Sequence, residues 1–170
     1  MEEEKKVDLE RTLVLLKVDA VQRGLMGRII QRFEDVGLKI VGMKMVWVDE
    51  RLASEHYNDL GIRRGEETKK RVVSMLTQGP VVAMAIEGIE AVAEVRMMVG
   101  STEPKAAQPG TIRGDFAHVS YGYADGHNIG IKNLIHASGT PEEAEREVML
   151  WFNFDELYKY KSVHDAHILE

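Results

Sequence analysis

The sequence contains no cysteine among its 170 residues. This absence excludes disulfides, thiolate zinc sites and cysteine nucleophiles, and it fits a reducing compartment. No stretch approaches the ~18 uninterrupted apolar residues that a membrane-spanning helix requires. The opening residues, MEEEKKVDLE, mix acidic and basic side chains without the apolar core of a signal peptide. We therefore expect a cytoplasmic protein that does not associate with membranes.

The sequence also lacks a glycine-rich phosphate motif, and its acidic residues outnumber its basic ones by 28 to 22. The segments GLMGR and GIRRG lack the spacing of a P-loop or a dinucleotide fingerprint, and neither directly follows an expected strand. The formal net charge of -6 disfavours nucleic-acid binding as the main activity. Any phosphate must therefore be bound by side chains, and five cations scattered along the sequence could converge to do so: Lys17, Arg23, Arg96, Arg113 and Lys132.

The chain has the length and the 44% hydrophobic content expected for one substantial core, so we expect a single domain over residues 1–170, with a leader over residues 1–9. Apolar runs of strand length alternate with amphipathic segments. The run Arg11–Lys17 is continuously apolar between its ends, as expected for a strand covered on both faces. The expected strands are 11–17, 38–48, 80–87 and 133–136, and residues 101–116 and 118–132 read as irregular loops.

This order of elements predicts an α+β fold. It matches the ferredoxin-like βαββαβ pattern, an antiparallel sheet with helices packed on one face and additional helices. A helix within residues 18–37 would place Met26, Ile29, Ile30, Phe33 and Val36 on one apolar stripe. A helix after the third strand would do the same with Ile89, Val92, Val95 and Val99.

The last long helix has a strong start signal. Thr140 is the expected N-cap, Pro141 takes the first helical position and Glu143 lies three residues after the cap, which predicts a capping box. Farther on, the segment His164–His167 reads as a solvated tail rather than as a set of metal ligands, and we predict no metal bound by the protein itself.

His136 stands out among the six histidines because it follows an apolar run and precedes the small residues Ala137, Ser138 and Gly139. On this pattern alone it could be a core histidine, a metal ligand, a general base or a nucleophile. Glu147 lies about two turns into the capped helix, close to the buried Val148, so its carboxylate could lean towards the strand end. A carboxylate on one ring nitrogen would fix the tautomer and leave the other nitrogen free to attack.

Several segments in combination resemble the nucleoside diphosphate kinase family, from about Glu10 to nearly the C-terminus. They are ERTLVLLKVDAVQRGLMG, HYNDL, GPVVAMAIEG, RMMVGSTEP, PGTIRGDF, NLIHASGTPEEAEREVMLWF and YKSVHD. The resemblance implies transfer of the terminal phosphate of a nucleoside triphosphate to a nucleoside diphosphate, by a ping-pong mechanism through a phosphohistidine at His136. The substrates would be ATP and other nucleoside tri- and diphosphates, with Mg²⁺ carried by their phosphates.

The same resemblance implies roles for individual residues. His136 would be the nucleophile, Glu147 would orient it, and Ser138 would hydrogen-bond nearby. Lys17 would bind the transferred phosphate, and Tyr57 would help to position Lys17 or the histidine. The nucleotide phosphates would be held by Arg96, Thr102 and Arg113, and the sugar hydroxyl by Asn133. Taken singly, Tyr57, Arg96, Thr102 and Asn133 also fit ordinary structural roles.

The chain departs from the family pattern where the base would stack. The segment GIRRGEETKK contains no aromatic residue, so Ile62 is a possible apolar substitute, and Tyr121 or Tyr123 in the long segment 116–132 could shield the base instead. Ala137 and Gly139 replace a more common glycine and aspartate around Ser138, and neither change removes a catalytic group.

Two other functional classes compete with this prediction. One is a nucleotide-binding assembly or regulatory protein of the same fold with impaired turnover, and the other is a nucleic-acid-binding regulator, which the acidic charge disfavours. The resemblance also implies a homo-oligomer, a hexamer rather than a tetramer, with Pro104 matching a loop that packs near a neighbouring subunit.

Overall fold

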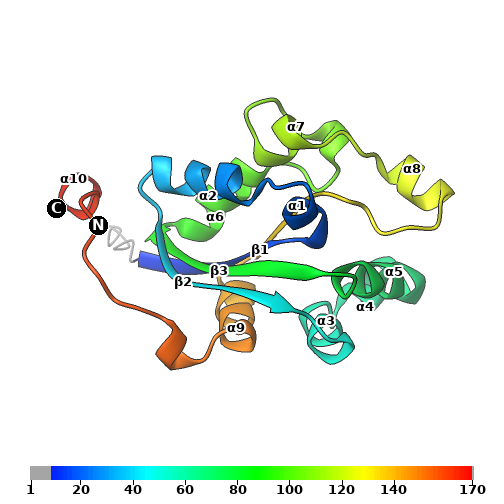
Figure 1. Ribbon diagram of the computed structural model, residues 1–170, viewed down its shortest axis with the longest axis horizontal. Helices are drawn as coiled ribbons and strands as arrows, with labels where there is room; N and C mark the ends of the chain where they lie inside the picture. Colours follow the sequence, from blue (N-terminus) through cyan, green and yellow to red (C-terminus); the bar gives the residue numbers. More distant parts are fainter. Residues whose placement is uncertain (1–8, 170) are drawn as a thin grey trace, which may run out of the picture.

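The computed structural model describes residues 9–169. Its four strands, β1 (Leu9–Leu16), β2 (Lys39–Trp47), β3 (Pro80–Ile89) and β4 (Ile135–Ala137), form one sheet in the order β2-β3-β1-β4 (Figure 1). Every neighbouring pair is antiparallel. This is the ferredoxin-like α+β arrangement, so the predicted fold class is confirmed. Of the predicted leader, residues 1–8 lie outside the described residues and Leu9 already belongs to β1.

The central strand β1 contributes to two cores. Val14 and Leu16 belong to one hydrophobic cluster, whereas Leu13 and Leu15 belong to another, as the two-residue period of a strand requires. Each of these side chains is fully buried, which contributes roughly 1.5–3 kcal/mol per residue. The expected burial of this strand on both faces is confirmed.

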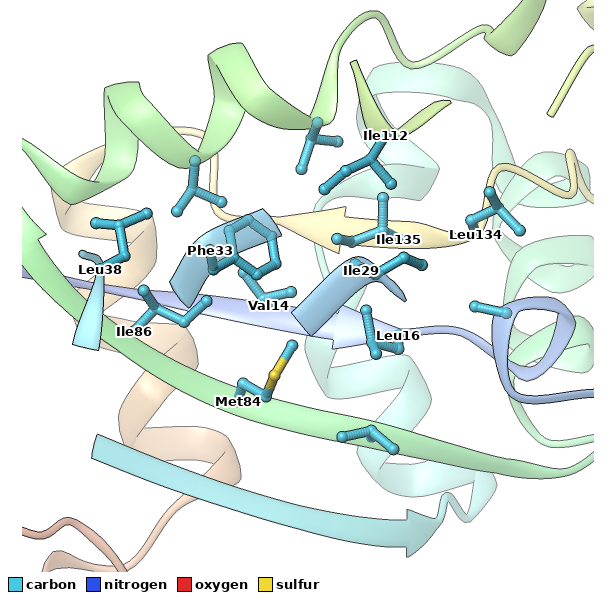
Figure 2. Close-up of a cluster of buried hydrophobic side chains, with 14 of the residues drawn as sticks. Val14, Leu16, Ile29, Phe33, Leu38, Met84, Ile86, Ile112, Leu134 and Ile135 are labelled. Carbon is cyan, nitrogen blue, oxygen red and sulfur yellow. The ribbon is translucent and has the colours of Figure 1, made fainter. Parts of the chain in front are cut away.

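Helices cover both faces of the sheet, so the prediction of helices on one face was wrong (Figure 1). On one face, α2 (Met26–Asp35) and α6 (Ala91–Val99) cover the first cluster; Figure 2 shows Ile29 and Phe33 lying over Val14 and Leu16. On the other face, residues of α3 (Glu50–His56), α5 (Glu66–Leu76) and α9 (Pro141–Trp151) form the second cluster. The remaining helical segments are α1 (Val18–Gln22), α4 (Leu60–Arg64), η1 (Pro104–Ala106), α7 (Ile112–Phe116), α8 (Tyr121–Gly126), η2 (Phe154–Glu156) and α10 (Asp165–Ile168).

Four local expectations need correction. Val36 follows the end of α2 at Asp35 and is 48% exposed, so it does not belong to the buried stripe of that helix. Ile89 ends β3 and is 42% exposed, because the left-handed Glu90 (φ 46°) separates it from α6. The segments expected to be irregular, 101–116 and 118–132, contain η1, α7 and α8, which are too short to show a helical period. Thr140 caps α9 as predicted by accepting from the Glu143 N–H, but the Glu143 carboxylate accepts from the Gly139 N–H rather than from the cap residue.

The C-terminal segment is largely exposed to solvent, as predicted, and two contacts also attach it to the sheet. Asp165 of α10 forms an ion pair with Lys39 of β2, with 2.9 Å between Nζ and Oδ2. The Tyr158 N–H also donates to the Val41 carbonyl, which ties this segment to the same strand. Within residues 9–169, no helix combines the length and the apolar character needed to cross a membrane.

Candidate active site

The register of β4 decides which way His136 faces. His136 pairs with Leu15 of β1 and lies between Ile135 and Ala137, which both pack into the cluster beneath α2 and α6. Because side chains alternate along a strand, the His136 ring points to the opposite face, where α3 and α9 lie. Leu15 faces the same way and belongs to that second cluster.

Helix α9 presents a carboxylate to this imidazole. The buried side of α9 consists of Ala144, Glu147, Val148 and Trp151, which is an amphipathic stripe with a glutamate in a core position. Glu147 Oε2 lies 2.8 Å from His136 Nε2 and also accepts a 2.7 Å hydrogen bond from the Ser138 hydroxyl. The Ser138 Oγ in turn accepts from the Leu13 N–H at 3.2 Å, so β1 holds the serine in place. The predicted grouping of His136, Glu147 and Ser138 is present.

This network defines the state of the imidazole. Burial favours the protonated form of Glu147, but the hydrogen bonds from His136 and Ser138 oppose it, and the pKa of Glu147 is lowered. An ionised carboxylate can only accept, so His136 Nε2 carries the proton and donates it. In a neutral ring the lone pair then belongs to Nδ1, which is the nitrogen left for chemistry.

A second network surrounds Lys17, the residue at the end of β1. Its ammonium donates to Asn133 Oδ1 at 2.6 Å, and the Asn133 amide donates to the Thr102 carbonyl at 2.8 Å. Burial lowers the pKa of Lys17 to about 8, an effect that Asp19 opposes and Arg113 strengthens. An incoming anion would stabilise a cation that is buried in this way.

The turn before β4 is strained. Leu134 has φ 69°, a left-handed value that bulky residues seldom adopt, and the Ile135 N–H donates to the Asn133 carbonyl two residues back, which makes a γ-turn. Such a conformation costs about 1–3 kcal/mol. It is held by Asp19, which accepts from the Leu134 N–H, and by the Lys17 N–H, which donates to the Leu134 carbonyl. These contacts hold Asn133 immediately before the strand that bears His136.

Arg113 of α7 is the second buried cation, and three backbone carbonyls hold its guanidinium. Nε donates to Asn133, Nη1 to Gly100 and Nη2 to Ile135. Burial lowers its pKa to about 10, which leaves it charged at neutral pH. A guanidinium has five N–H donors, so two remain for a ligand.

These residues line one cavity of about 570 Å³, a size suited to a nucleotide. Eight of the nine residues predicted for the site line this cavity. The ninth, Ser138, is fully buried behind Glu147. Of the five scattered cations, Lys17, Arg96 and Arg113 line it, whereas Arg23 donates to the Phe116 carbonyl and Lys132 is not part of the lining. Three further arginines that sequence reasoning missed complete the wall: Arg63, Arg64 and Arg146.

The cavity also distinguishes among the candidates for base contact. Tyr121 lines it, with the Arg64 guanidinium 5.1 Å from the centre of its ring. Tyr123 instead stacks on His127 and is 57% exposed. Ile62 is 90% exposed and does not line the cavity. The geometry therefore favours Tyr121 over the other two.

Sequence reasoning missed His56, the last residue of α3. It is 2% exposed, its ring centre is 4.4 Å from that of His136, and its Nδ1 is 3.9 Å from Glu147 Oε1. Helical spacing was the available signal, because His56 follows the buried Ala53 by three residues.

His56, His136 and Glu147 offer ligand atoms within 4.8 Å of one another, as a metal site would. Each of these side chains is already engaged in a hydrogen bond, however: Trp151 donates to His56 Nδ1 at 3.2 Å, and His136 Nε2 bonds to Glu147. A metal ion would have to displace both protons, and the arrangement fits an oriented imidazole better than a ligand set.

An oriented imidazole beside a cavity lined by cations has the features that a phosphotransferase site requires. The comparisons with known proteins specify which kind. Residues 10–157 match the nucleoside diphosphate kinase family. The nucleoside diphosphate kinase of Pyrococcus furiosus is 49% identical over 160 residues, which cover 93% of this chain and 92% of that protein.

Solved structures agree with this match. A transition-state mimic of the nucleoside diphosphate kinase from Borrelia burgdorferi, with bound vanadate and ADP, has a TM-score of 0.93 at 41% identity and covers 95% of this chain and 97% of that one. A halophilic nucleoside diphosphate kinase from Halobacterium salinarum, in complex with CDP, has a TM-score of 0.83 at 41% identity and covers 96% of this chain and 100% of that one. The chain belongs to the nucleoside diphosphate kinase family, and it is an enzyme that transfers phosphate between nucleotides.

Proposed function

We propose that His136 carries the phosphoryl group between the two nucleotides. The hydrogen bond between His136 Nε2 and Glu147 is the observation that supports this role, because it leaves the Nδ1 lone pair free. In the first half-reaction Nδ1 forms a bond to the terminal phosphorus, and the bond from that phosphorus to its bridging oxygen breaks. The nucleoside diphosphate leaves with the electron pair. In the second half-reaction a terminal oxygen of another diphosphate attacks the same phosphorus, and Nδ1 recovers its lone pair.

Glu147 stabilises the phosphorylated ring. When Nδ1 bonds to phosphorus, the imidazole retains its Nε2 proton and becomes cationic, and the carboxylate 2.8 Å away offsets that charge. Ser138 keeps the carboxylate oxygen aligned with Nε2 through its own 2.7 Å bond. Glu147 and Ser138 therefore act on the ring, not on the nucleotide.

The cations of the cavity hold the phosphates. Lys17 binds the transferred group, and the two remaining donors of Arg113, together with Arg96 and Thr102, bind the rest of the phosphate chain. Asn133 uses one amide hydrogen on the Thr102 carbonyl, so its second hydrogen is left for a sugar hydroxyl. Tyr57 packs edge-on against the His56 ring, with its centre 6.3 Å from that of His136, and helps to position the nucleophile.

The substrate in this scheme is a nucleotide that carries Mg²⁺ on its phosphates. The carboxylates of the cavity wall are engaged, since Asp59 pairs with Arg63, Glu143 accepts from the Gly139 N–H and Glu147 binds His136. The oxygen ligands of the metal would therefore come from the phosphates. Tyr121 shields the base in place of the aromatic residue that the segment 61–70 lacks. Contact through a ring face tolerates any base, so broad specificity follows.

A two-step labelling experiment tests this function. Purified protein receives ATP labelled at the terminal phosphate, is freed of nucleotide and then receives GDP. The wild type should retain the label on the protein and release it as labelled GTP. His136→Ala should do neither, and His167→Ala, which changes an exposed histidine, should do both. Transfer that persists in His136→Ala would rule out the assignment.

The binding protein with impaired turnover is not favoured, because the matching family and relatives are kinases by name and His136 keeps the hydrogen bond to Glu147 that the proposed mechanism needs. We further propose a single domain, a cytoplasmic location and assembly into a hexamer rather than a tetramer. Self-association is supported by the outer strand β2, on which Met43 and Met45 are more than half exposed. Sedimentation equilibrium would test the assembly, and a monomer at micromolar concentration would contradict it.

A further inference from the structure

The His56 side chain packs against the His136 ring and lies close to the Glu147 carboxylate. Its ring lies edge-on to the His136 ring at 4.4 Å between centres, with an interplanar angle of 82°. It makes a second edge-on contact with Trp151 of α9 at 5.6 Å. The side chain thus bridges α3 to β4 and α9, the two elements that carry His136 and Glu147.

The tautomer of His56 is fixed by Trp151. An indole N–H can only donate, and Trp151 Nε1 lies 3.2 Å from His56 Nδ1, so Nδ1 must carry a lone pair. The proton of the neutral ring therefore belongs to Nε2, which is buried and has no partner within residues 9–169. A charged ring would place a second N–H against that of the indole. Burial, with the nearby His136, Lys17 and Arg146, also keeps the pKa of His56 well below its usual value.

This tautomer determines how Glu147 is used. His56 Nδ1 lies 3.9 Å from Glu147 Oε1, near enough that a proton on Nδ1 would attract the carboxylate. Because Nδ1 instead offers a lone pair, it does not compete, and the carboxylate directs Oε2 to His136 and Ser138. The hydrogen bond from Trp151 to His56 therefore leaves the Glu147 carboxylate free to bind His136.

The ring of His56 also limits how His136 can turn. A single hydrogen bond from Nε2 to Glu147 allows the imidazole to swivel about the line that joins the two atoms. The edge-on contact with His56 blocks that rotation on one side. Nδ1 is then held in one direction, as a near-attack geometry requires.

We propose that His56 is a positioning residue for phosphoryl transfer, and that Trp151 holds it in the Nε2-protonated tautomer. Its two effects are to keep Glu147 bonded to His136 and to fix the rotation of the nucleophilic ring. The inference rests on the proposed role of His136, and its failure can be told apart from failure of that role, since His136→Ala abolishes phosphorylation whether or not His56 matters.

Two variants separate the two effects. His56→Asn keeps an acceptor for the Trp151 N–H but removes the ring that packs on His136. Trp151→Phe keeps an aromatic side chain in the core but removes the donor, so His56 can move its proton to Nδ1 and bind Glu147. His127→Asn and Trp47→Phe make the same chemical changes at exposed positions and serve as matched controls.

The measurements are the single-turnover rate of His136 phosphorylation by Mg-ATP as a function of pH, and the tautomer of His136 from nitrogen NMR. We expect His56→Asn to slow phosphorylation by about tenfold to hundredfold, with little change in the ATP concentration that gives half the maximal rate. Trp151→Phe should shift the pH dependence and reduce the fraction of His136 protonated on Nε2. The control variants should match the wild type in both measurements.

Folding is checked by the thermal transition of each variant. The contrary result is a variant that shows a folded transition while its rate stays within twofold of the wild type and the His136 tautomer is unchanged. For His56→Asn, that result would overturn the claim that the His56 ring fixes the rotation of His136. For Trp151→Phe, it would overturn the claim that Trp151 keeps Glu147 bonded to His136. A rate that falls only in proportion to the folded fraction, with the pH profile and tautomer unchanged, would likewise reduce His56 to a packing residue. If one of the variants does not fold, the same criteria apply to the other.

Discussion

The charge of Glu147 can be removed without removing its hydrogen bonds. In Glu147→Gln the amide oxygen can still accept from His136 Nε2 and from the Ser138 hydroxyl, because one carboxylate oxygen serves both donors. The amide cannot neutralise the cationic ring that forms when Nδ1 bonds to phosphorus. The variant therefore isolates the electrostatic contribution from the positional one.

The size of this contribution follows from the geometry. A hydrogen bond to a charged group is stronger than a neutral one by about 1–2 kcal/mol. The Coulomb energy of two unit charges ~4 Å apart, at an effective dielectric constant of about 20, is ~4 kcal/mol, which sets the upper limit for the same charge effect. We therefore expect Glu147→Gln to lose about 2–4 kcal/mol of transition-state stabilisation, and phosphorylation should slow roughly thirtyfold to thousandfold.

Rapid-quench measurement of labelled phosphate on the protein, after mixing with Mg-ATP, gives this rate directly. Glu145→Gln, an exposed change on the same helix, is the control and should match the wild type. A rate for Glu147→Gln within about threefold of the wild type, in a folded protein, would refute the claim that the carboxylate stabilises the phosphorylated ring.

Three further predictions concern binding and stability. The pKa of Lys17 in the free enzyme is lowered to about 8, so its charge is lost above that pH, and kcat/KM should fall as pH rises through about 8; a profile that is flat from pH 7 to 9 would contradict the role of this lysine. Tyr121→Ala should remove about 1–3 kcal/mol of base contact and raise KM for ATP by roughly fivefold to hundredfold with little loss of kcat, whereas Tyr123→Ala should leave both constants unchanged in steady-state assays. Thr140→Ala removes the cap of α9 and should cost about 1 kcal/mol, seen as a loss of ~2–4 °C in the thermal midpoint; an unchanged midpoint would show that the cap does not stabilise the helix.

The local elements of this chain follow from its sequence. The unbroken apolar run of β1 indicated burial on both faces, and Thr140 with Pro141 fixed the start of α9. Once α9 begins at Pro141, its spacing places Glu147 on the buried side, facing the strand that bears His136. The pairing of Glu147 with His136 was predictable because neighbouring residues in the sequence indicate both the start of α9 and the strand that bears His136.

The missed features depend on contacts between distant parts of the chain. His56 and Trp151 are 95 positions apart and interact only because α3 and α9 cover the same face of the sheet. Placing helices on one face only, as the sequence-based prediction did, hides this contact. The left-handed Leu134 has no local signal either, since no glycine or asparagine occupies that position and Asp19 supplies the support from another element.

Mapping of acid-labile phosphate after brief exposure to Mg-ATP tests the central claim most directly. The account predicts one labelled site, His136 with phosphorus on Nδ1, and complete loss of the label when GDP is added. Label on any other residue, on Nε2 of His136, or on His136 in a form that GDP cannot discharge would contradict it.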